Sequence, residues 1–282
     1  MILMFLPKLI EYLRLLNRYR VYQRLLKKPC TKHPDGFFYS GRGTTMNSGA
    51  REAFETEIFK KILNEIKIFV NIGAHHGYYS CLALSKNIET IAYEPEATNI
   101  EMIKKHIAAN NFLPAFELHA AAVGSMHGEL TLFGGNSGGS LLQSNGHNRA
   151  PKAQQQKVKV VTLNKTLDLK NLKSLCLMDI EGFEYEALKG ATEILSAENK
   201  PYWIVEVWPK DENGAVNPNF AKVFSLMETF GYQAWGIDEH TKRLMDLPLK
   251  LAKLVEKGEV EIDFINFLFI QKGDSLLMRL DL

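Results

Sequence analysis

Gly73, Gly77 and Glu94 have the residue types and the spacing needed to hold a nucleotide cofactor. Both glycines follow the apolar run 66–72, where the absence of a side chain lets backbone N–H groups come close to a ligand. Glu94 ends the next apolar run, where a carboxylate can accept hydrogen bonds from both hydroxyls of a ribose. A strand, a glycine turn, a helix and a second strand ending on an acid make a βαβ unit. The sequence therefore predicts a cofactor that contains adenosine.

The composition of the glycine turn distinguishes between cofactors. A dinucleotide fingerprint G-x-G-x-x-G that starts at Gly73 would need glycine where His75 and Tyr78 stand, so a pyrophosphate would meet side chains. S-adenosylmethionine has no phosphate, and the looser pattern from Asn71 to Gly77 is typical of its methyltransferases. We therefore predict S-adenosylmethionine, with a NAD-type oxidoreductase as the alternative. The predicted cofactor-binding residues in this part of the chain are Asn71, Gly73, Ala74, His75, Gly77, Tyr78 and Glu94.

Acids at other predicted strand ends supply groups for the reaction. Open parallel sheets bind ligands at the carboxyl ends of their strands, which gathers Asp179, Glu181 and Glu206 along one edge with His76 nearby. Transfer of a methyl group to a hydroxyl needs an acceptor in line with the departing sulfur and a base for its proton. We predict Asp179 as the preferred base, Glu181 and His76 as alternatives, and Glu206 as a substrate-binding residue. A purely structural role, capping the helix near residue 183, is the competing explanation for Glu181 or Glu184.

Three motifs make the chain resemble the FkbM-type methyltransferases. The family's D-x-G-A-x-x-G turn is matched at 71–77 in every position but the first, and the E-P pair is Glu94-Pro95. The segment 179–184 matches D-x-E-G-x-E and is followed by L-x-G-A at 188–191. The resemblance implies a Rossmann-like class I methyltransferase fold that O-methylates a hydroxyl, commonly on a sugar, a glycan or a natural product.

The same resemblance assigns further residues and shows two departures. Ser140 matches a serine of the family, which implies a contact with the substrate, and Ala121 and Ala122 correspond by analogy to the adenine site. Asn71 stands where the family has aspartate, so one negative charge near the cofactor is missing. Leu177 stands where lysine is common, so that lysine's role cannot be transferred to this chain.

Alternating apolar runs and helical patterns predict an α/β fold. The expected sheet is mainly parallel and seven-stranded, with helices on both faces and an inserted β-hairpin at 129–133 and 157–163. The loop 134–142 inside that hairpin is a candidate lid. The tryptophans at 203, 208 and 235 are expected in the core rather than against a sugar. The predicted strands lie near residues 66–72, 90–94, 116–123, 174–179, 201–207, 232–237 and 261–270.

The amino-terminal part differs in composition from the rest. We predict three parts: a basic amphipathic helix at 1–28, a linker at 29–49 and a methyltransferase domain at 50–282. Between Lys8 and Lys28, seven basic residues face one acid, a local charge of +6. This helix could lie on an anionic membrane surface or pack against the domain or a partner subunit, and both explanations stay open.

Composition narrows the possible partners. A formal charge of +2 over 282 residues and the absence of a basic run in the catalytic stretch argue against a nucleic-acid substrate, which leaves a small-molecule or glycan acceptor. No set of side chains has the spacing of metal ligands, so we expect no metal. Three widely spaced cysteines predict a cytoplasmic protein, membrane-peripheral if the helix binds lipid. A catalytically inactive scaffold with this fold is the remaining alternative.

Overall fold

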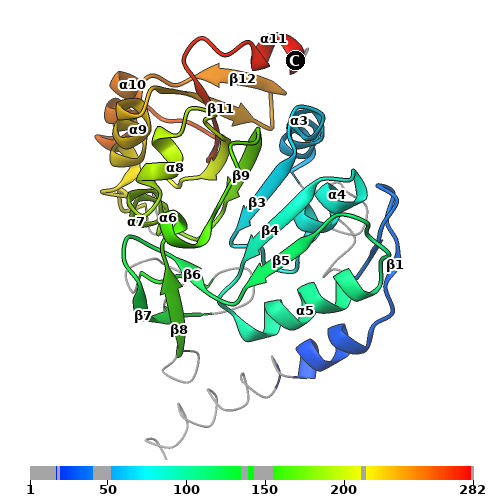
Figure 1. The fold of residues 1–282 in the computed structure, drawn as a ribbon. Helices are drawn as coiled ribbons and strands as arrows, with labels where there is room; N and C mark the ends of the chain where they lie inside the picture. Colours follow the sequence, from blue (N-terminus) through cyan, green and yellow to red (C-terminus); the bar gives the residue numbers. More distant parts are fainter. Residues whose placement is uncertain are drawn as a thin grey trace, which may run out of the picture.

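The computed structural model describes residues 17, 20–40, 52–134, 139–142, 155–210 and 214–280. Its centre is an eight-stranded sheet in the order β12-β11-β13-β10-β9-β3-β4-β5 (Figure 1). The strands of this sheet, in that order, are Arg243–Asp246, Tyr232–Asp238, Asn266–Gln271, Tyr202–Glu206, Ser174–Met178, Ile68–Ile72, Glu89–Tyr93 and Phe116–His119.

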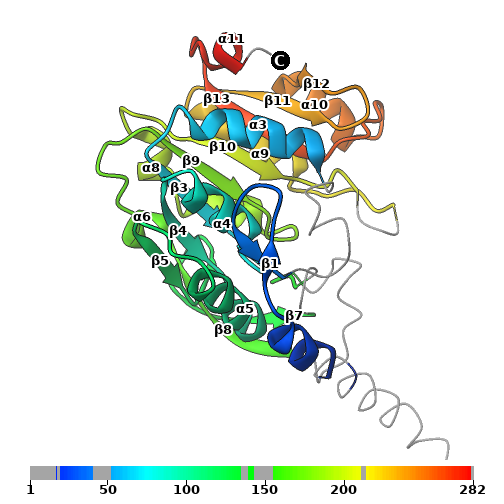
Figure 2. The same cartoon turned by 90° about the vertical axis from the view of Figure 1, so that its right-hand side faces the viewer.

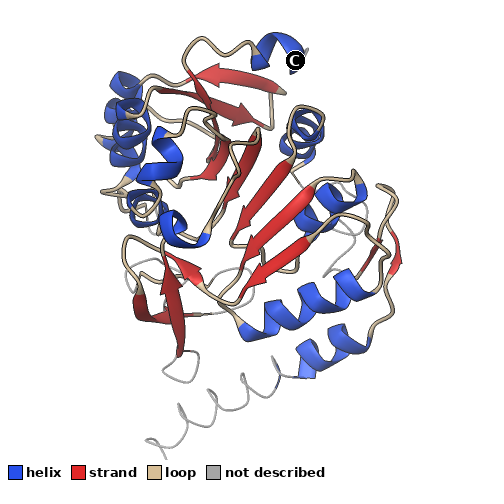
Figure 3. Cartoon of the chain, viewed as in Figure 1, coloured by secondary structure: helices blue, strands red, loops and turns tan. Residues whose placement is uncertain are grey.

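Helices cover both faces of this sheet (Figure 3). One core joins the sheet to α7, α8, α9 and α10, and a second core on the other face joins it to α3 and α4. The helices are α3 Ala53–Leu63, α4 Tyr78–Ser85, α5 Ala97–Ala108, α6 Leu163–Thr166, α7 Glu184–Lys189, α8 Thr192–Ser196, α9 Phe220–Thr229, α10 Leu249–Glu256 and α11 Leu276–Leu280.

The prediction of a Rossmann-like α/β fold is confirmed, with corrections to the strands. Five neighbouring strands from β10 to β5 are parallel, whereas the pairs β10–β13, β13–β11 and β11–β12 are antiparallel. The sheet has eight strands rather than seven, because residues 243–246 return beside β11 as a hairpin. The strand expected at 261–270 begins only at Asn266.

The strand expected at 116–123 is divided between two sheets. β5 ends at His119, whose carbonyl accepts a hydrogen bond from Ala121 N–H at 2.9 Å, and this turn directs the chain out of the central sheet. β6, Ala122–Val123, then pairs with β8, Gln155–Val161, in a three-stranded sheet of order β6-β8-β7. β7, Gly128–Phe133, is antiparallel to β8, so the inserted hairpin is confirmed.

Helix α3 shows how the apolar pattern orients an element above the site. Phe54, Ile58, Phe59 and Ile62 recur at helical spacing and are all buried in the core that contains β3 residue Phe69. A short connection leads from α3 into β3, so the helix runs opposite to the strand. The amino end of α3 therefore lies at the carboxyl end of the parallel strands (Figure 2).

The described part of the predicted linker is folded against the domain. β1, Thr31–Lys32, pairs with β2, Phe38–Tyr39, and both Phe37 and Tyr39 are buried in the core under α3 and α4. The presence of these aromatic residues in a turn-rich segment could have indicated this burial from the sequence. Residues 41–49 of that linker lie outside the described residues.

Most of the predicted basic helix at 1–28 lies outside the described residues. Residues 20–27 are helical and lie beside α5 in both views (Figures 1 and 2). Lys105 Nζ of α5 donates to the carbonyl of Leu25 at 2.8 Å, which satisfies a carbonyl near the end of that helix. In the described part of the chain, no helix combines the length and the apolar character needed to cross a membrane.

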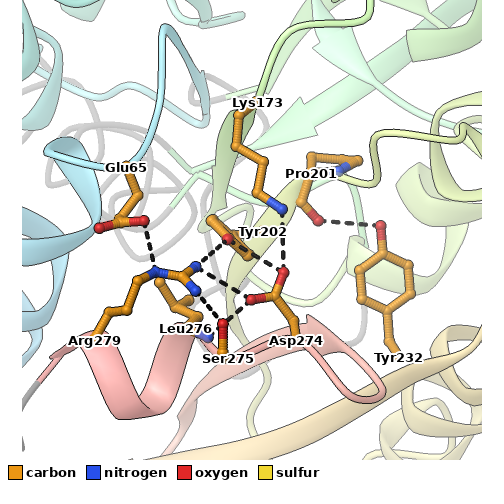
Figure 4. Close-up of polar contacts among 9 residues, drawn as sticks. All are labelled: Glu65, Lys173, Pro201, Tyr202, Tyr232, Asp274, Ser275, Leu276 and Arg279. Atoms are coloured by element: carbon orange, nitrogen blue, oxygen red, sulfur yellow. Dashed lines mark hydrogen bonds and ion pairs between the residues drawn. The ribbon is translucent and has the colours of Figure 1, made fainter.

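A network of charged side chains holds α11 at the amino ends of β9 and β10 (Figure 4). Arg279 Nε donates to Glu65 Oε2 at 2.8 Å, and its Nη2 donates to Asp274 Oδ1 at 3.3 Å and to the Tyr202 hydroxyl at 3.2 Å. Lys173 Nζ lies 3.1 Å from Asp274 Oδ2. Each acid of this network therefore has a basic partner.

Candidate active site

A cavity of about 370 Å³ lies at the carboxyl ends of β3, β4, β9 and β10. This volume is within the range of roughly 300–1,000 Å³ that is common for small-molecule sites. The turns that follow these strands supply its walls, and the amino end of α3 and part of the loop at 139–141 complete it. The position is the one expected for ligands of open α/β sheets.

The turn between β3 and α4 is fixed by the neighbouring strands. The N–H groups of Gly73 and Ala74 both donate to the carbonyl of Tyr93, at 2.9 and 3.0 Å. Gly73 has a φ of +83°, and a Cβ built on it would lie 1.9 Å from the carbonyl oxygen of Asp179. Glycine is therefore required here by the close approach of the β9 end as well as by backbone conformation.

Glu94 lines the cavity and holds the glycine turn in place. Its side chain accepts hydrogen bonds from the N–H of His75 at 2.7 Å, the N–H of Glu96 at 2.9 Å and Asn99 Nδ2 at 3.2 Å. Glu94 is only 4 % exposed, and this burial raises the pKa of its carboxyl to about 7 although the three hydrogen bonds oppose the shift. The carboxyl thus connects the turn after β3 with the start of α5.

The turn after β9 places two acids in the cavity wall and uses a third to stabilise itself. Asp179 N–H donates to the carbonyl of Ile72 at 3.0 Å, and Asp179 and Glu181 both line the cavity. Glu181 has a φ of +55°, in the left-handed region that favours glycine, next to Gly182 at +98°. Glu184 is buried, accepts a hydrogen bond from Gly182 N–H at 2.8 Å and does not line the cavity. Neither of these two described acids caps α7, contrary to the competing explanation, and Glu184 instead stabilises the turn before the helix.

Eleven of the predicted site residues line this one cavity, although they come from five separate segments. They show that the strand ends bring together residues up to 135 positions apart, as a parallel sheet should. The eleven are Asn71, Gly73, Ala74, His75, Tyr78, Glu94, Ala121, Ala122, Asp179, Glu181 and Glu206.

Three predicted site residues, His76, Gly77 and Ser140, are not among the lining residues. The ring of His76 stacks on that of His75 at 3.9 Å, and its carbonyl accepts a hydrogen bond from His106 Nδ1 at 2.7 Å. Gly77 precedes α4, and a Cβ on it would lie 3.2 Å from Ile103. Ser140 Oγ donates to the carbonyl of Glu181 at 2.7 Å, so it supports the acidic turn from behind.

Glu55, on α3, is a cavity residue that the sequence reasoning missed. Its carboxyl accepts a hydrogen bond from the Tyr79 hydroxyl at 3.0 Å, and the other oxygen, Oε2, has no hydrogen-bond partner among the described residues. Glu55 is 4 % exposed, and burial, followed by the nearby Glu52, raises the pKa of its carboxyl well above the usual range. It precedes Ile58 and Ile62 by one and two helical turns, so an acid on the apolar face was the available signal.

The tryptophans divide between core and cavity. Trp203 is fully buried, as expected, and its Nε1 donates to the Tyr232 hydroxyl at 3.3 Å. Trp208 is 42 % exposed and lines the cavity, which corrects the expectation of a core position. The difference arises because Trp203 lies within β10 whereas Trp208 lies beyond its end.

The cavity wall is acidic. No lysine or arginine lines it in the described part of the chain. Burial, and then repulsion from Asp179 and Glu181, raises the pKa of Glu206 well above the usual range. Within the same described residues, no three histidine, cysteine or acidic side chains are placed to share a metal ion.

Comparison with solved structures gives similarities at low identity. The precorrin-6y C5,15-methyltransferase of Geobacter metallireducens is 14 % identical, with a TM-score of 0.40, and the match covers 86 % of this chain and 98 % of that one. The StiE O-methyltransferase domain is 9 % identical, with a TM-score of 0.44 over 82 % and 78 %. An O-methyltransferase of a Brevibacillus brevis multienzyme, solved with S-adenosyl-L-homocysteine, is 11 % identical, with a TM-score of 0.37 over 90 % and 87 %.

Sequence families give a more specific result. No curated protein matches the chain. The model of the methyltransferase FkbM domain matches residues 71–234, from the start of the glycine turn into β11. This match spans more than half of the chain and includes both motif-bearing turns of the cavity. The chain therefore belongs to the FkbM methyltransferase family.

Proposed function

We propose that this protein O-methylates a hydroxyl of a sugar, a glycan or a natural product. As a member of the FkbM family it is a methyltransferase, and S-adenosylmethionine is its methyl donor. The observation that supports the proposal best is one cavity that contains both the glycine turn with Glu94 and the acids Asp179 and Glu206. A cofactor end and an acceptor end thus lie in the same cavity.

The β4 side of the cavity suits adenosine. Glu94 lines the cavity and can accept hydrogen bonds from ribose hydroxyls there. Ala121 and Ala122, beyond β5, have small side chains that leave room for a flat base. Asn71 Nδ2 donates to Ser80 Oγ at 2.9 Å, which orients the amide that replaces the family aspartate. These residues can therefore hold the cofactor in the orientation that the sequence predicts.

The β9 side supplies groups for the acceptor. When bound, S-adenosylmethionine provides a methyl group that is electrophilic because it is attached to a charged sulfur. Asp179 is the proposed base, which takes the proton of the acceptor hydroxyl as its oxygen gains the methyl group. Glu181 lies two residues further along the same turn and is proposed to orient the acceptor. His76 is a poorer candidate base because it does not line the cavity.

The proposal is tested by offering an isotope-labelled methyl donor to glycan pools and cell extracts. We expect the label in methyl ethers of the products, and we expect Asp179→Asn to remove most of the incorporation. The matched control is Asp168→Asn, at a position outside the cavity wall. Label found on nitrogen or carbon, or no label in any fraction, would contradict O-methylation.

A further inference from the structure

We propose that the acceptor carries a protonated amine, which binds between Glu55 and Glu206 at the end of the cavity opposite to Glu94. This inference rests on the proposed function and adds a substrate class to it. It depends on two carboxyls that are separate from the residues assigned to the cofactor, to proton transfer and to the D-x-E-G-x-E turn.

The positions of the two acids place this subsite beyond the cofactor end. Glu206 is the last residue of β10 and Glu94 follows β4, and β9 and β3 lie between these strands. Three strand spacings of about 4.8 Å separate them by roughly 14 Å across the sheet. Glu55, in the first turn of α3, lines the same cavity.

The surroundings of the two carboxyls leave part of their hydrogen-bonding capacity unused, since the Glu55 carboxyl accepts only one hydrogen bond from the described residues, that of the Tyr79 hydroxyl at 3.0 Å. The backbone N–H groups at the start of α3, of Phe54 and Glu55, donate to the carboxylate of Glu239 at 3.1 and 2.7 Å, so the helix end is already satisfied. The other oxygen of Glu55, Oε2, has no hydrogen-bond partner in the part of the chain that the structure describes, although Glu55 is more than nine-tenths buried. The side chain of Glu206 makes no hydrogen bond or ion pair with any described residue. Buried polar atoms without partners are rare in folded proteins, so Glu55 Oε2, on the cavity wall, is the atom that a bound ligand would be expected to contact.

The charge of the subsite selects a cation over a neutral group. Glu55 is buried and Glu206 is half-buried on the cavity wall, and the acids beside them oppose ionisation of both, because further negative charge would be uncompensated in a medium of low dielectric constant. An ammonium group replaces a carboxyl proton at such a site, since it brings one positive charge and three hydrogen-bond donors. A hydroxyl supplies one donor and no charge, and so leaves the repulsion in place. Burial, and then repulsion from acids that include Asp179 and, to a smaller extent, Glu55, raises the pKa of Glu206.

Trp208 adds an aromatic surface near these acids. It follows Glu206 by two residues, lines the cavity and keeps 42 % of its surface exposed. The face of an indole ring attracts cations and also stacks on sugar rings. An amino sugar, or another amine with neighbouring hydroxyls, therefore matches the three residues together.

The test compares matched ligands in a calorimeter. D-glucose and its 2-amino, 3-amino and 6-amino deoxy derivatives are titrated into protein saturated with S-adenosylhomocysteine at near-neutral pH. We expect one amine to bind roughly tenfold or more tightly than glucose, about the discrimination that one charge-assisted hydrogen bond gives. Glu55→Gln and Glu206→Gln keep the shape of the site, and each should remove most of this preference. Glu193→Gln, on α8 outside the cavity, should leave it unchanged.

The outcomes separate this inference from the proposed function. If the amines bind no better than glucose, or if none of the four sugars gives a heat of binding, the inference is overturned. Either result is compatible with normal binding of S-adenosylhomocysteine. A preference that persists in both glutamine variants would also overturn the inference. Failure of S-adenosylhomocysteine itself to bind would instead contradict the proposed function. Each amine titration is repeated in two buffers of different ionisation enthalpy, which measures the protons exchanged on binding. Net release of protons supports the replacement of a carboxyl proton by the amine.

Discussion

The two ends of the central sheet use charged residues in opposite ways. At the amino ends of β9 and β10, Asp274 has two basic partners, Lys173 and Arg279, and Glu65 shares Arg279 (Figure 4). At the carboxyl ends of the same strands the described cavity wall has acids and no lysine or arginine. Ion pairs at one end attach α11 to the domain, whereas the acids at the other end line the cavity. Changes at the two ends should therefore have separable effects on stability and on activity.

The largest effect is expected from Gly73→Ala. The new Cβ would meet the carbonyl oxygen of Asp179 at 1.9 Å, so the turn after β3 and the turn after β9 could not both keep their positions. We expect loss of detectable S-adenosylhomocysteine binding and a decrease in the free energy of unfolding of about 3 kcal/mol or more. The matched control is Gly231→Ala, which has a similar φ of +80° and whose new Cβ would have no heavy atom of the described residues within 4 Å, apart from its chain neighbours. Gly231→Ala should lower the free energy of unfolding by only about 1–2 kcal/mol and leave S-adenosylhomocysteine binding intact. Equal effects of the two variants would contradict the explanation that the contact with Asp179 requires glycine at position 73.

The next effect separates activity from stability at the carboxyl end. Asp179→Asn should lower the rate of methyl transfer by about 10²–10⁴, the usual contribution of a general base. The melting temperature should not fall, because the change removes a negative charge that repels Glu206 and Glu55. Single-turnover assays and thermal melts measure the two quantities. A variant that loses stability together with activity would show that Asp179 is mainly structural.

A smaller effect concerns the pH dependence of stability. Burial raises the pKa of Glu184 to about 7, from a value near 4.5 in the unfolded chain. The folded state therefore holds more protons than the unfolded state between these values, and stability should fall as the pH rises from about 4.5 to 7. Glu184→Gln cannot ionise, so its melting temperature should fall less over this range. Parallel slopes for the two proteins would contradict the burial of this carboxyl.

The smallest effect is expected at the amino end. Arg279→Gln removes the ion pairs with Glu65 and Asp274, both of which involve a partly exposed guanidinium. Such pairs contribute about 1 kcal/mol or less, so unfolding in urea should shift only slightly. S-adenosylhomocysteine affinity should stay the same. A loss of affinity would show that the two ends of the sheet are coupled, and would contradict the expectation that changes at the two ends have separable effects.

Local sequence predicted the parts of the site that belong to one strand and its following turn. Gly73, Glu94 and Asp179 were found in this way, because the end of a parallel strand fixes where the next residues lie. Glu55 was not found, since its place in the cavity depends on how α3 packs over strands more than one hundred residues away in sequence. Ser140 was expected to contact the substrate because it matches a family serine, but it does not line the cavity and its hydroxyl donates to the carbonyl of Glu181.

The fold shows the same division between local and distant information. The alternating pattern predicted the central parallel strands β3 and β9 correctly, because each is buried on both faces and reads as an apolar run. β12 was missed because it is short and largely exposed, and only its pairing with β11 makes it a strand. The split of 116–123 depends on a single turn after His119, which apolar residues on both sides conceal.

The central claim is that the carboxyl ends of β3 and β4 hold the adenosine of S-adenosylmethionine through Glu94. The most direct measurement is calorimetric titration of S-adenosylhomocysteine into the wild-type protein, Glu94→Gln, Glu94→Ala and the surface control Glu101→Ala, with NADH as a second ligand. We predict micromolar binding to the wild type and the control, roughly tenfold weaker binding to Glu94→Gln and none to Glu94→Ala. Unchanged binding in both Glu94 variants, or binding of NADH in place of S-adenosylhomocysteine, would contradict the claim.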